Sequence, residues 1–421
     1  MNILAIKDAF LQKTWSDRAY MVMYAGLCIY ILCMPLGRAF RETGTVLAAC
    51  GLLCYYLLDY RHSRFAQFPL KWFFGAFWLY MFIKVFHSIN VHESWYIFEH
   101  GLRKGVLFFF VGMECVRSIQ DLKRFTILFC IMGCYEGLDG IYQYATGYDL
   151  LRGTALFYER LTGSFSTPRV GDLMAVTLPV VTGSFFLWMP ARKKQTRSLF
   201  TLLILFPALF LLVGAQSRSA YIGFSCASIS MLWFFRGLTW KHIGIIILLL
   251  LGVLFGGLER VSMDNALTDS RLLHLWPAAI SVFKEMPLLG IGVGGFHEGV
   301  QSLGISLPPP WDSIVHPHNI YLQLACETGI VGLGLFGVWI GSSLWWSWKK
   351  IRFGWLQGAT PSAWGMAFCF WSSYVGYLAT AFSAHDFFRP WWLGLSLAIL
   401  GITLGACMPL ASETSSKASF P

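Results

Sequence analysis

Long apolar segments separated by short polar ones run along most of the chain. Twelve of these segments are long enough to cross the hydrocarbon core of a bilayer as helices, some of them with a tilt. They lie near residues 19–36, 44–59, 71–89, 104–116, 125–146, 170–190, 198–215, 219–235, 243–258, 319–347, 364–384 and 390–409. The pattern therefore predicts an all-α polytopic membrane protein with about 12 transmembrane helices.

One stretch between apolar segments is much longer than the others and covers residues 259–318. Loops of this length are usually either functional or disordered. We expect this one to be ordered, because its apolar residues recur at helical spacing. These residues are Leu272, Leu273, Trp276, Ile280 and Phe283. Pro277 should kink or split that helix, and its apolar face would lie on the membrane surface or on the roof of the bundle.

Basic residues predict the orientation of the chain. Lys and Arg number 32 against 22 Asp and Glu, a net charge of +10. Cytoplasmic loops of membrane proteins concentrate Lys and Arg, and an N-terminus inside the cell places 19 of the 32 in inner loops. Both termini are then cytoplasmic, and the basic excess requires no nucleic-acid partner. The expected parts are helices 1–9 in 1–258, an outer loop in 259–318, helices 10–12 in 319–410 and a cytoplasmic tail in 411–421.

Composition excludes two other classes of protein. Hydrophobic residues make up 56% of the chain and charged residues 13%, whereas a soluble domain has about 25% charged residues. So few charges cannot cover the surfaces of several soluble domains. A disordered chain would need low hydrophobicity and high charge.

The other 13 basic residues fall on the outer side in this topology. They are Arg38, Arg41, Lys84, Arg103, Lys104, Arg152, Arg160, Arg169, Arg218, Arg260, Arg271, Lys284 and Arg389. About half would serve loop solubility and contact with lipid headgroups. The rest indicate an anionic ligand, since the planar fork of arginine binds two oxygens of a phosphate or diphosphate.

Three motifs have structural explanations that we favour over chemical ones. The glycine run Gly290–Gly295 resembles a phosphate-binding loop, but no βαβ unit surrounds it, so a tight turn is favoured. Glu136 and Asp139, one turn apart within an apolar segment, are more consistent with interhelical hydrogen bonds than with an acid–base pair. His316 and His318 lack a DxD, HExxH or cysteine-pair partner, so we expect no metal and no cofactor.

A polar stripe opens the tenth apolar segment. Asn319, Gln323 and Glu327 recur at intervals of four and share one helical face. Ionisable groups within a membrane usually face a bundle interior or a water-filled cavity and are functional by default. His318 precedes this stripe at the outer rim, and histidine is the side chain best suited to act as a general base near neutral pH.

Several segments together resemble one family. Arg160–Phe165 matches an RxxGxF motif, and Ser217–Ala220 matches an SR-small motif. Ser270–Arg271, Trp276 and Lys284–Gly294 match the long outer loop of the family. His318–Asn319 with Gly329 and Gly332 matches an H[NSQ]x9GxxG signature. In these motifs, taken together and in this order, the sequence resembles the bacterial lipopolysaccharide O-antigen ligase and polymerase superfamily. The resemblance covers roughly 135–341 by motif and the whole chain by topology.

The resemblance implies a GT-C-type glycosyltransferase of the bacterial inner membrane with its active site facing the periplasm. The donor would be O-antigen polysaccharide on undecaprenyl diphosphate, and the acceptor a sugar hydroxyl of lipid A–core. The reaction would invert the anomeric carbon without a metal.

The same resemblance implies roles for particular residues. His318 would be the base, and Arg218 and Arg271 would hold the donor diphosphate. The other expected substrate-binding residues are Arg160, Arg169, Asn319, Ser217 and Trp276, with Asn319 orienting His318. The segment Ser166–Arg169 departs from relatives that often have an asparagine after the proline, which leaves the role of Arg169 open.

Three other functions were weighed against the ligase. An O-antigen polymerase more often enlarges two outer loops, whereas here the loop at 147–169 is short. A protein O-oligosaccharyltransferase commonly carries extra C-terminal sequence. A flippase for the same lipid would explain arginines and intramembrane acids but not a histidine signature beside a long outer loop, and duplicated halves, which would favour a transporter, are not evident.

Overall fold

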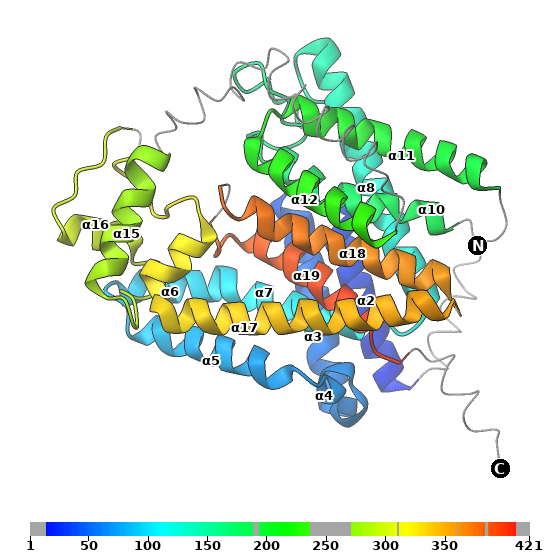
Figure 1. The fold of residues 1–421 in the computed structure, drawn as a ribbon, viewed down its shortest axis with the longest axis horizontal. Coiled ribbons are helices and arrows are strands. Elements are labelled where there is room, and N and C mark those ends of the chain that lie inside the picture. The colour runs from blue at the N-terminus through cyan, green and yellow to red at the C-terminus, as the bar shows by residue number, and fades with distance from the viewer. Residues whose placement is uncertain are drawn as a thin grey trace.

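The computed structural model describes residues 14–187, 193–235, 271–309, 311–358, 360–383 and 386–409. In these ranges the regular elements are helices, with two isolated β-bridges after α8 and no strand. They are α2 (Trp15–Leu32), α3 (Arg38–Asp59), η1 (Tyr60–His62), α4 (Arg64–Gln67), α5 (Lys71–Phe86), α6 (Val91–Ile97), η2 (Phe98–Leu102), α7 (Arg103–Glu114), α8 (Ile119–Thr146), α9 (Val170–Thr182), α10 (Ser184–Leu187), α11 (Lys194–Gly214), α12 (Arg218–Phe234), η4 (Arg271–Leu275), α15 (Trp276–Glu285), α16 (Phe296–Ser302), α17 (Ile320–Gln357), α18 (Pro361–Thr380) and α19 (Pro390–Ala406). Many run along the long axis of the molecule, with α15 and α16 at one end of it (Figure 1).

Helices occupy every predicted apolar segment except 243–258, which lies outside the described residues. Five of the described segments are long and apolar enough to cross a membrane: Arg38–His62, Ile119–Thr146, Val170–Leu187, Lys194–Gly214 and Ile320–Gln357. The helices at the other predicted segments are shorter or less apolar. The described chain is thus an all-helical, polytopic membrane protein, and the total of twelve spans stays a prediction.

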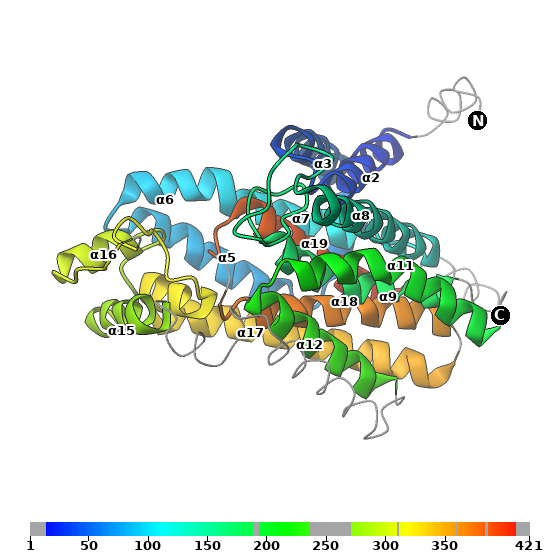
Figure 2. The ribbon, with the colours of Figure 1, turned by 90° about the horizontal axis from the view of Figure 1, so that it is seen from above.

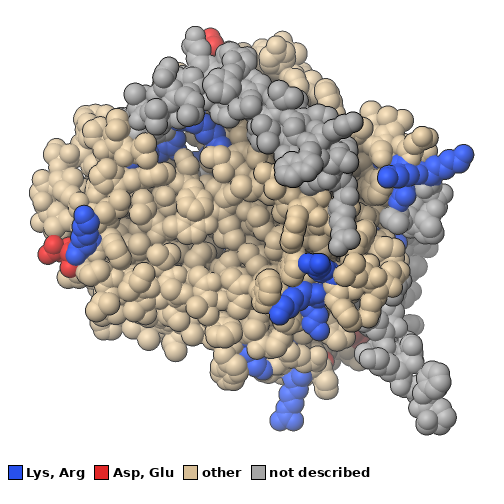
Figure 3. Space-filling view, viewed as in Figure 1, with Lys and Arg blue, Asp and Glu red and all other residues tan. Residues whose placement is uncertain are grey.

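The lateral surface of the helix bundle is largely apolar, as is typical of a surface that faces lipid. Figure 3 shows a broad middle region of one face with few charged side chains. On α3 and α11, large apolar side chains point outward, and they include Val46, Leu53, Leu57, Leu199, Leu202, Leu203 and Phe206. Such a contiguous exposed apolar surface is typical of contact with a membrane or another protein.

The core is organised around α19, in which every residue from Trp392 to Ala406 is buried. This helix packs closely on α7, because a Cβ atom at Gly112 or at Gly401 would collide with backbone of the other helix. Small residues at such crossings allow helix backbones to approach each other. In Figure 2, α7 and α19 lie between α2 and α3 on one side and α12, α17 and α18 on the other.

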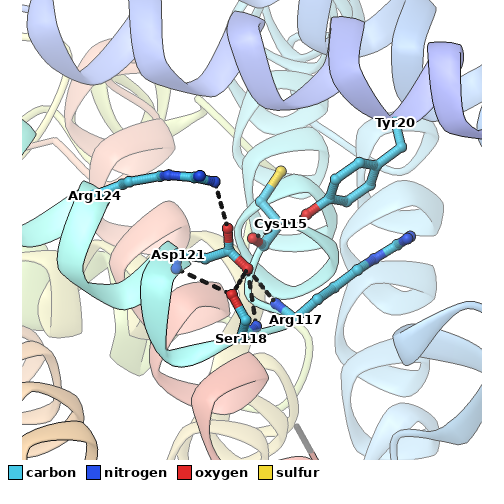
Figure 4. Close-up of polar contacts among 6 residues, drawn as sticks. All are labelled: Tyr20, Cys115, Arg117, Ser118, Asp121 and Arg124. Carbon is cyan, nitrogen blue, oxygen red and sulfur yellow. Dashed lines mark hydrogen bonds and ion pairs between the residues drawn. The ribbon is translucent and has the colours of Figure 1, made fainter. Parts of the chain in front are cut away.

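A network of backbone contacts fixes the junction between α7 and α8, at the end of the bundle predicted to be cytoplasmic (Figure 4). Ser118 and Asp121 form a capping box that satisfies free N–H groups of the first turn of α8. The Asp121 carboxylate also accepts from the backbone N–H of Arg117 at 3.1 Å and from Arg124 Nη1 at 3.3 Å. Tyr20 of α2 ties the junction to the neighbouring helix by donating to the Cys115 carbonyl oxygen at 3.3 Å.

The long helix α17 is broken at Gly329, where φ is +69° and ψ is −175°. The glycine run fills this break. On the helix side, the Cys326 carbonyl oxygen accepts from Ile291 N–H at 3.1 Å. The Glu327 carbonyl oxygen accepts from Gly292 N–H at 2.8 Å, and Glu327 Oε2 accepts from Gly294 N–H at 2.6 Å. On the far side of the break, Ile330 N–H donates to the Pro287 carbonyl oxygen at 2.8 Å. The run is therefore a turn, as predicted, and its N–H groups are directed to the protein's own chain.

The described part of the outer segment, 271–309 and 311–318, contains the short helices expected there. The π-turn η4 gives way to α15 at Trp276, and Pro277 stands in the first turn of α15, where the missing N–H is tolerated. Of the predicted apolar face, Leu272, Leu273 and Ile280 are exposed, while Trp276 and Phe283 are partly buried. The side chains buried against the bundle are Leu275, Ala278, Ala279 and Val282. The small alanines let α15 approach α17 closely, so the bulkier residues turn outward.

Candidate functional site

Two of the segments that carry predicted site residues attach to the loop at the C-terminal end of α18. The backbone N–H of Ile320, two residues after His318, donates to the carbonyl oxygen of Ala381 at 3.0 Å. Arg271 Nη1 donates to the carbonyl oxygen of Ser383 at 2.6 Å. Segments that are far apart in the sequence, around 271 and around 318, are thus attached to neighbouring carbonyls of one short loop.

Arg218 lies at the same end of the bundle. Helix α12 runs antiparallel to α18, because Gly223 packs on Thr380 and, one to two turns later, Ser230 Oγ hydrogen-bonds Ser372 Oγ at 3.0 Å. Arg218 precedes Gly223 by five residues, or about 7.5 Å along the helix axis. It therefore lies beyond Thr380, at the level of the loop that Arg271 contacts.

Arg160 fixes the turn that leads into α12. Its Nε donates to the Ala215 carbonyl oxygen at 2.9 Å, and its Nη2 donates to the Gln216 carbonyl oxygen at 3.0 Å. These carbonyl oxygens follow the last turn of α11 and receive no hydrogen bond from an N–H group of the helix. By satisfying them, Arg160 holds the turn from which Ser217 and Arg218 emerge.

Ser217 shares a buried carboxylate with a neighbour. Ser217 Oγ lies 3.4 Å and Ser219 Oγ 2.7 Å from Oδ1 of Asp172, which is 3% exposed in the first turn of α9. Sequence reasoning missed Asp172, although a carboxylate one turn after Arg169 was a signal that could have found it. Asp172 joins the start of α9 to the start of α12.

Arg169 ends the loop before α9 and lies close to two carboxylates. Burial lowers the pKa of its guanidinium, while the charges of Asp172 and Asp386 raise it. Asp386 belongs to the segment between α18 and α19. The positive charge at the start of α9 is therefore partly neutralised from both sides.

His318 adopts a left-handed backbone conformation with φ of +54°, which is uncommon for a residue other than glycine. Its backbone N–H donates to Nδ1 of the buried His316 at 3.2 Å, and the two rings lie 4.2 Å apart. The ring of Trp311 is 5.8 Å from that of His318. His318 itself is only half-buried, so its imidazole is presented at the rim.

Asn319 caps α17 rather than contacting the imidazole through its side-chain oxygen. Its Oδ1 accepts from the backbone N–H groups of Tyr321 and Leu322 at 3.0 and 3.1 Å. Capping of this kind typically stabilises a helix by about 1 kcal/mol. Because Asn319 directly follows His318, the cap fixes the backbone that carries the predicted base.

The polar stripe of α17 continues into the 386–388 segment. Gln323 Nε2 donates to Oδ1 of Asp386 at 2.8 Å, and the backbone N–H of Phe387 donates to Gln323 Oε1 at 2.8 Å. Sequence reasoning placed Gln323 on one face with Asn319 and Glu327 but missed Asp386, which lies 63 residues away in the chain. The stripe is thus used for holding the start of α19 against α17.

Glu136 and Asp139 make structural hydrogen bonds, but to the loop between α8 and α9 and not to another helix as predicted. Glu136 Oε1 accepts from the backbone N–H of Ser164 at 2.8 Å, and Asp139 Oδ1 from that of Leu150 at 2.7 Å. Both acceptors face the loop between α8 and α9. These carboxylates therefore position the segment that carries Arg160 and Arg169.

Trp276, the remaining expected residue, lies where η4 passes into α15 and packs against the apolar cluster of the outer helices. Its indole nitrogen is buried and has no hydrogen-bond partner among the described residues. Three or more His, Cys, Asp or Glu side chains do not come together at a metal-binding spacing anywhere in the described ranges.

The electrostatics at this end favour an anion. Helices α9, α12 and α17 all begin there, and helix N-termini carry partial positive charge and free N–H groups. Arg160, Arg169, Arg218 and Arg271 add full charges to the same region. Asp172 and Asp386 are engaged with serine, glutamine and backbone donors.

Residues 200–337 match the family model described as O-antigen ligase. The matched stretch runs from α11 into α17 and contains Arg218, Arg271 and His318. This match supports membership of the O-antigen ligase superfamily. Members of this superfamily are glycosyltransferase-like ligases or polymerases, which supports an enzymatic role. The comparison with curated proteins gave no match.

Proposed function

We propose that the chain is an O-antigen ligase. It transfers polysaccharide from undecaprenyl diphosphate to a sugar hydroxyl of lipid A–core at the periplasmic face of the inner membrane. The bundle would have twelve transmembrane helices in a GT-C-type arrangement, with both termini in the cytoplasm. The match over residues 200–337 supports the superfamily, and the site geometry supports the reaction.

The observation that carries the proposal is the attachment of two segments to the loop at the end of α18, with a third segment at the same level. Arg271 is bonded to Ser383 and the backbone after His318 to Ala381. Arg218 lies at the same level on α12. A transferase that uses a lipid diphosphate needs cations for the leaving group and a base for the acceptor at one place.

In the proposed reaction the acceptor hydroxyl oxygen forms a bond to the anomeric carbon of the donor sugar. The bond from that carbon to the diphosphate oxygen breaks, and the hydroxyl proton passes to the His318 imidazole. Attack from the face opposite the diphosphate inverts the anomeric configuration. Arg218 and Arg271 stabilise the charge that develops on the leaving diphosphate, and they take the place that a divalent metal has in other transferases.

The surrounding residues act by positioning in this account. Arg160 holds the turn that delivers Arg218, and Asp172 ties that turn to α9. Asn319 and His316 hold the backbone of His318 from its two sides. Ser217, Trp276 and Arg169 remain candidates for contact with the glycan or the diphosphate.

Reconstitution with purified components tests the proposal. The protein in proteoliposomes, with EDTA present, is given lipid-linked glycan with or without lipid A–core. Glycan attached to lipid A–core supports the ligase. Glycan growth that needs no lipid A–core would identify a polymerase, transfer to an added protein would identify a protein O-oligosaccharyltransferase, and movement across the bilayer without a new bond would identify a flippase.

A further inference from the structure

A cation-rich cavity of about 230 Å³ lies between α2, α3, α6, η2, α7 and the start of α19. Its basic residues are Arg38, Arg41, Lys104 and His100, and its aromatic residues include Tyr30 and Trp391. Arg152 adds a further charge next to it, since its Nη2 donates to the Pro35 carbonyl oxygen at 3.2 Å. Glu42 is the one carboxylate that lines it.

Some of the basic side chains of this cavity are paired with groups of the protein itself, and one is not. Lys104 Nζ pairs with Glu42 Oε1 at 2.5 Å, and Arg41 Nη1 donates to the Met34 carbonyl oxygen at 3.1 Å. Arg38 is exposed at the rim and makes no hydrogen bond or ion pair with another described residue. Three full positive charges therefore face one carboxylate, and the surplus suits an anion of one or two charges.

The cavity adjoins the candidate site and lies next to exposed apolar side chains of α3. Trp391 lines the cavity, and its ring lies 5.4 Å from that of Phe165 in the loop that carries Arg160. Below the rim, α3 presents the exposed side chains of Val46, Leu53 and Leu57. A ligand with a phosphate in the cavity would have an apolar surface for acyl chains beside it.

We propose that this cavity binds the phosphorylated headgroup of the acceptor glycolipid, separately from the donor diphosphate. The inference rests on the proposed function, since it assigns the second substrate of that reaction. Two lipid substrates that both carry phosphate need two anion sites in one leaflet, and the donor is assigned to Arg218 and Arg271. The Phe165–Trp391 contact places the two sites next to each other.

The test compares Arg38→Glu with Arg103→Glu. Arg103 is an exposed arginine one residue before Lys104 but does not line the cavity, so it controls for the charge of the surface. Initial rates are measured with intact lipid A–core and with the same acceptor after phosphatase treatment. In Arg38→Glu, we expect the KM for the intact acceptor to rise by about tenfold, because one charged partner is replaced by a repelling one. The KM for the donor and the kcat should stay unchanged, and Arg103→Glu should behave as the wild type.

Other results would overturn the inference. A raised KM for the donor would assign the cavity to the diphosphate lipid. An equal effect with the dephosphorylated acceptor would show that phosphate is not what the cavity binds. If Arg38→Glu lowers the retention of phosphatidylglycerol as much as that of lipid A–core, the cavity is a general phospholipid site. If micromolar inorganic phosphate competes with lipid A–core, the cavity is a free-anion site.

Binding without catalysis separates this inference from the proposed function. Native mass spectrometry of the protein with lipid A–core measures binding whether or not transfer occurs. Phosphate-dependent binding that Arg38→Glu weakens supports the cavity even if no ligation is found. Transfer by the wild type together with unchanged binding and an unchanged KM for the acceptor in Arg38→Glu would refute the cavity and leave the ligase intact.

Discussion

The backbone N–H of His318 donates to Nδ1 of His316 across 3.2 Å. That nitrogen must be unprotonated to accept, so neutral His316 stabilises the left-handed backbone of His318. The geometry makes His316 a positioning residue for His318. We expect His316→Ala to lower the transfer rate by about five- to tenfold, the worth of one ordinary hydrogen bond.

The matched control is His297→Ala, since His297 belongs to the same outer segment but hydrogen-bonds the Ile314 carbonyl oxygen and Gln301. Its rate should stay near that of the wild type. Restoration of His316→Ala by an asparagine at position 316, whose side-chain oxygen can accept, would support the positioning role. A His316→Ala variant as inactive as a base-deleted enzyme would contradict it.

Arg218→Ala and Arg271→Ala should each lower transfer by about ten- to a hundredfold, because a hydrogen bond to a charged group typically contributes 1.5–3 kcal/mol. Lysine at either position should restore only part of the rate, since it supplies the charge but not the two-pronged geometry. Rates are measured on purified variants whose thermal unfolding matches the wild type. Full activity in both alanine variants would move the diphosphate to Arg160, Arg169 or the Arg38–Arg41 pair.

Gly329→Ala should destabilise the protein by about 2 kcal/mol or more, because φ +69° with ψ −175° is a conformation that costs side-chain-bearing residues about 1–3 kcal/mol. The added Cβ would also collide with the Leu288 carbonyl oxygen. Gly334→Ala is the control on the same helix, since its Cβ would meet no atom within 4 Å. Thermal unfolding in detergent should show a lower midpoint for the first variant and an equal or higher one for the second. Equal midpoints would refute the break at Gly329.

A topology reporter fused after Lys350 should read cytoplasmic, and one inserted at Leu303 should read periplasmic. Helix α17 connects the two sides, and its far end carries Lys349, Lys350 and Arg352, as the inner ends of membrane helices do. A cytoplasmic signal at Leu303 would place His318 on the wrong side for a lipid-linked glycan and would end the proposed mechanism.

The fold was largely predictable because it depends on local patterns. Apolar runs placed the helices, and the motif around Arg160–Phe165 placed a loop beside the start of α9. Pro277, which was expected to kink or split a helix, stands in the first turn of α15. Local periodicity could not say which face of α15 is buried, because that depends on the small residues Ala278 and Ala279 fitting against another helix.

The site was predictable as a set of residue types and not as a set of contacts. Motifs singled out Arg218, Arg271 and His318, but the loop at Ala381–Ser383 that receives two of their segments carries no chemical signal of its own. Asp386 was missed for the same reason, since its contact with Gln323 is fixed only when α17, α18 and α19 pack. The partner of the glycine run, Glu327, likewise required the break in α17.

The transfer rate of His318→Ala tests the central claim most directly. Labelled lipid-linked glycan and lipid A–core are mixed with purified wild type, His318→Ala and His297→Ala in proteoliposomes, and donor affinity is measured separately. General-base catalysis typically contributes about 10²–10⁴-fold, so His318→Ala should lose that factor while the donor Kd and the unfolding midpoint stay unchanged. A His318→Ala variant that transfers glycan at the wild-type rate would contradict the account and leave the base to be sought elsewhere.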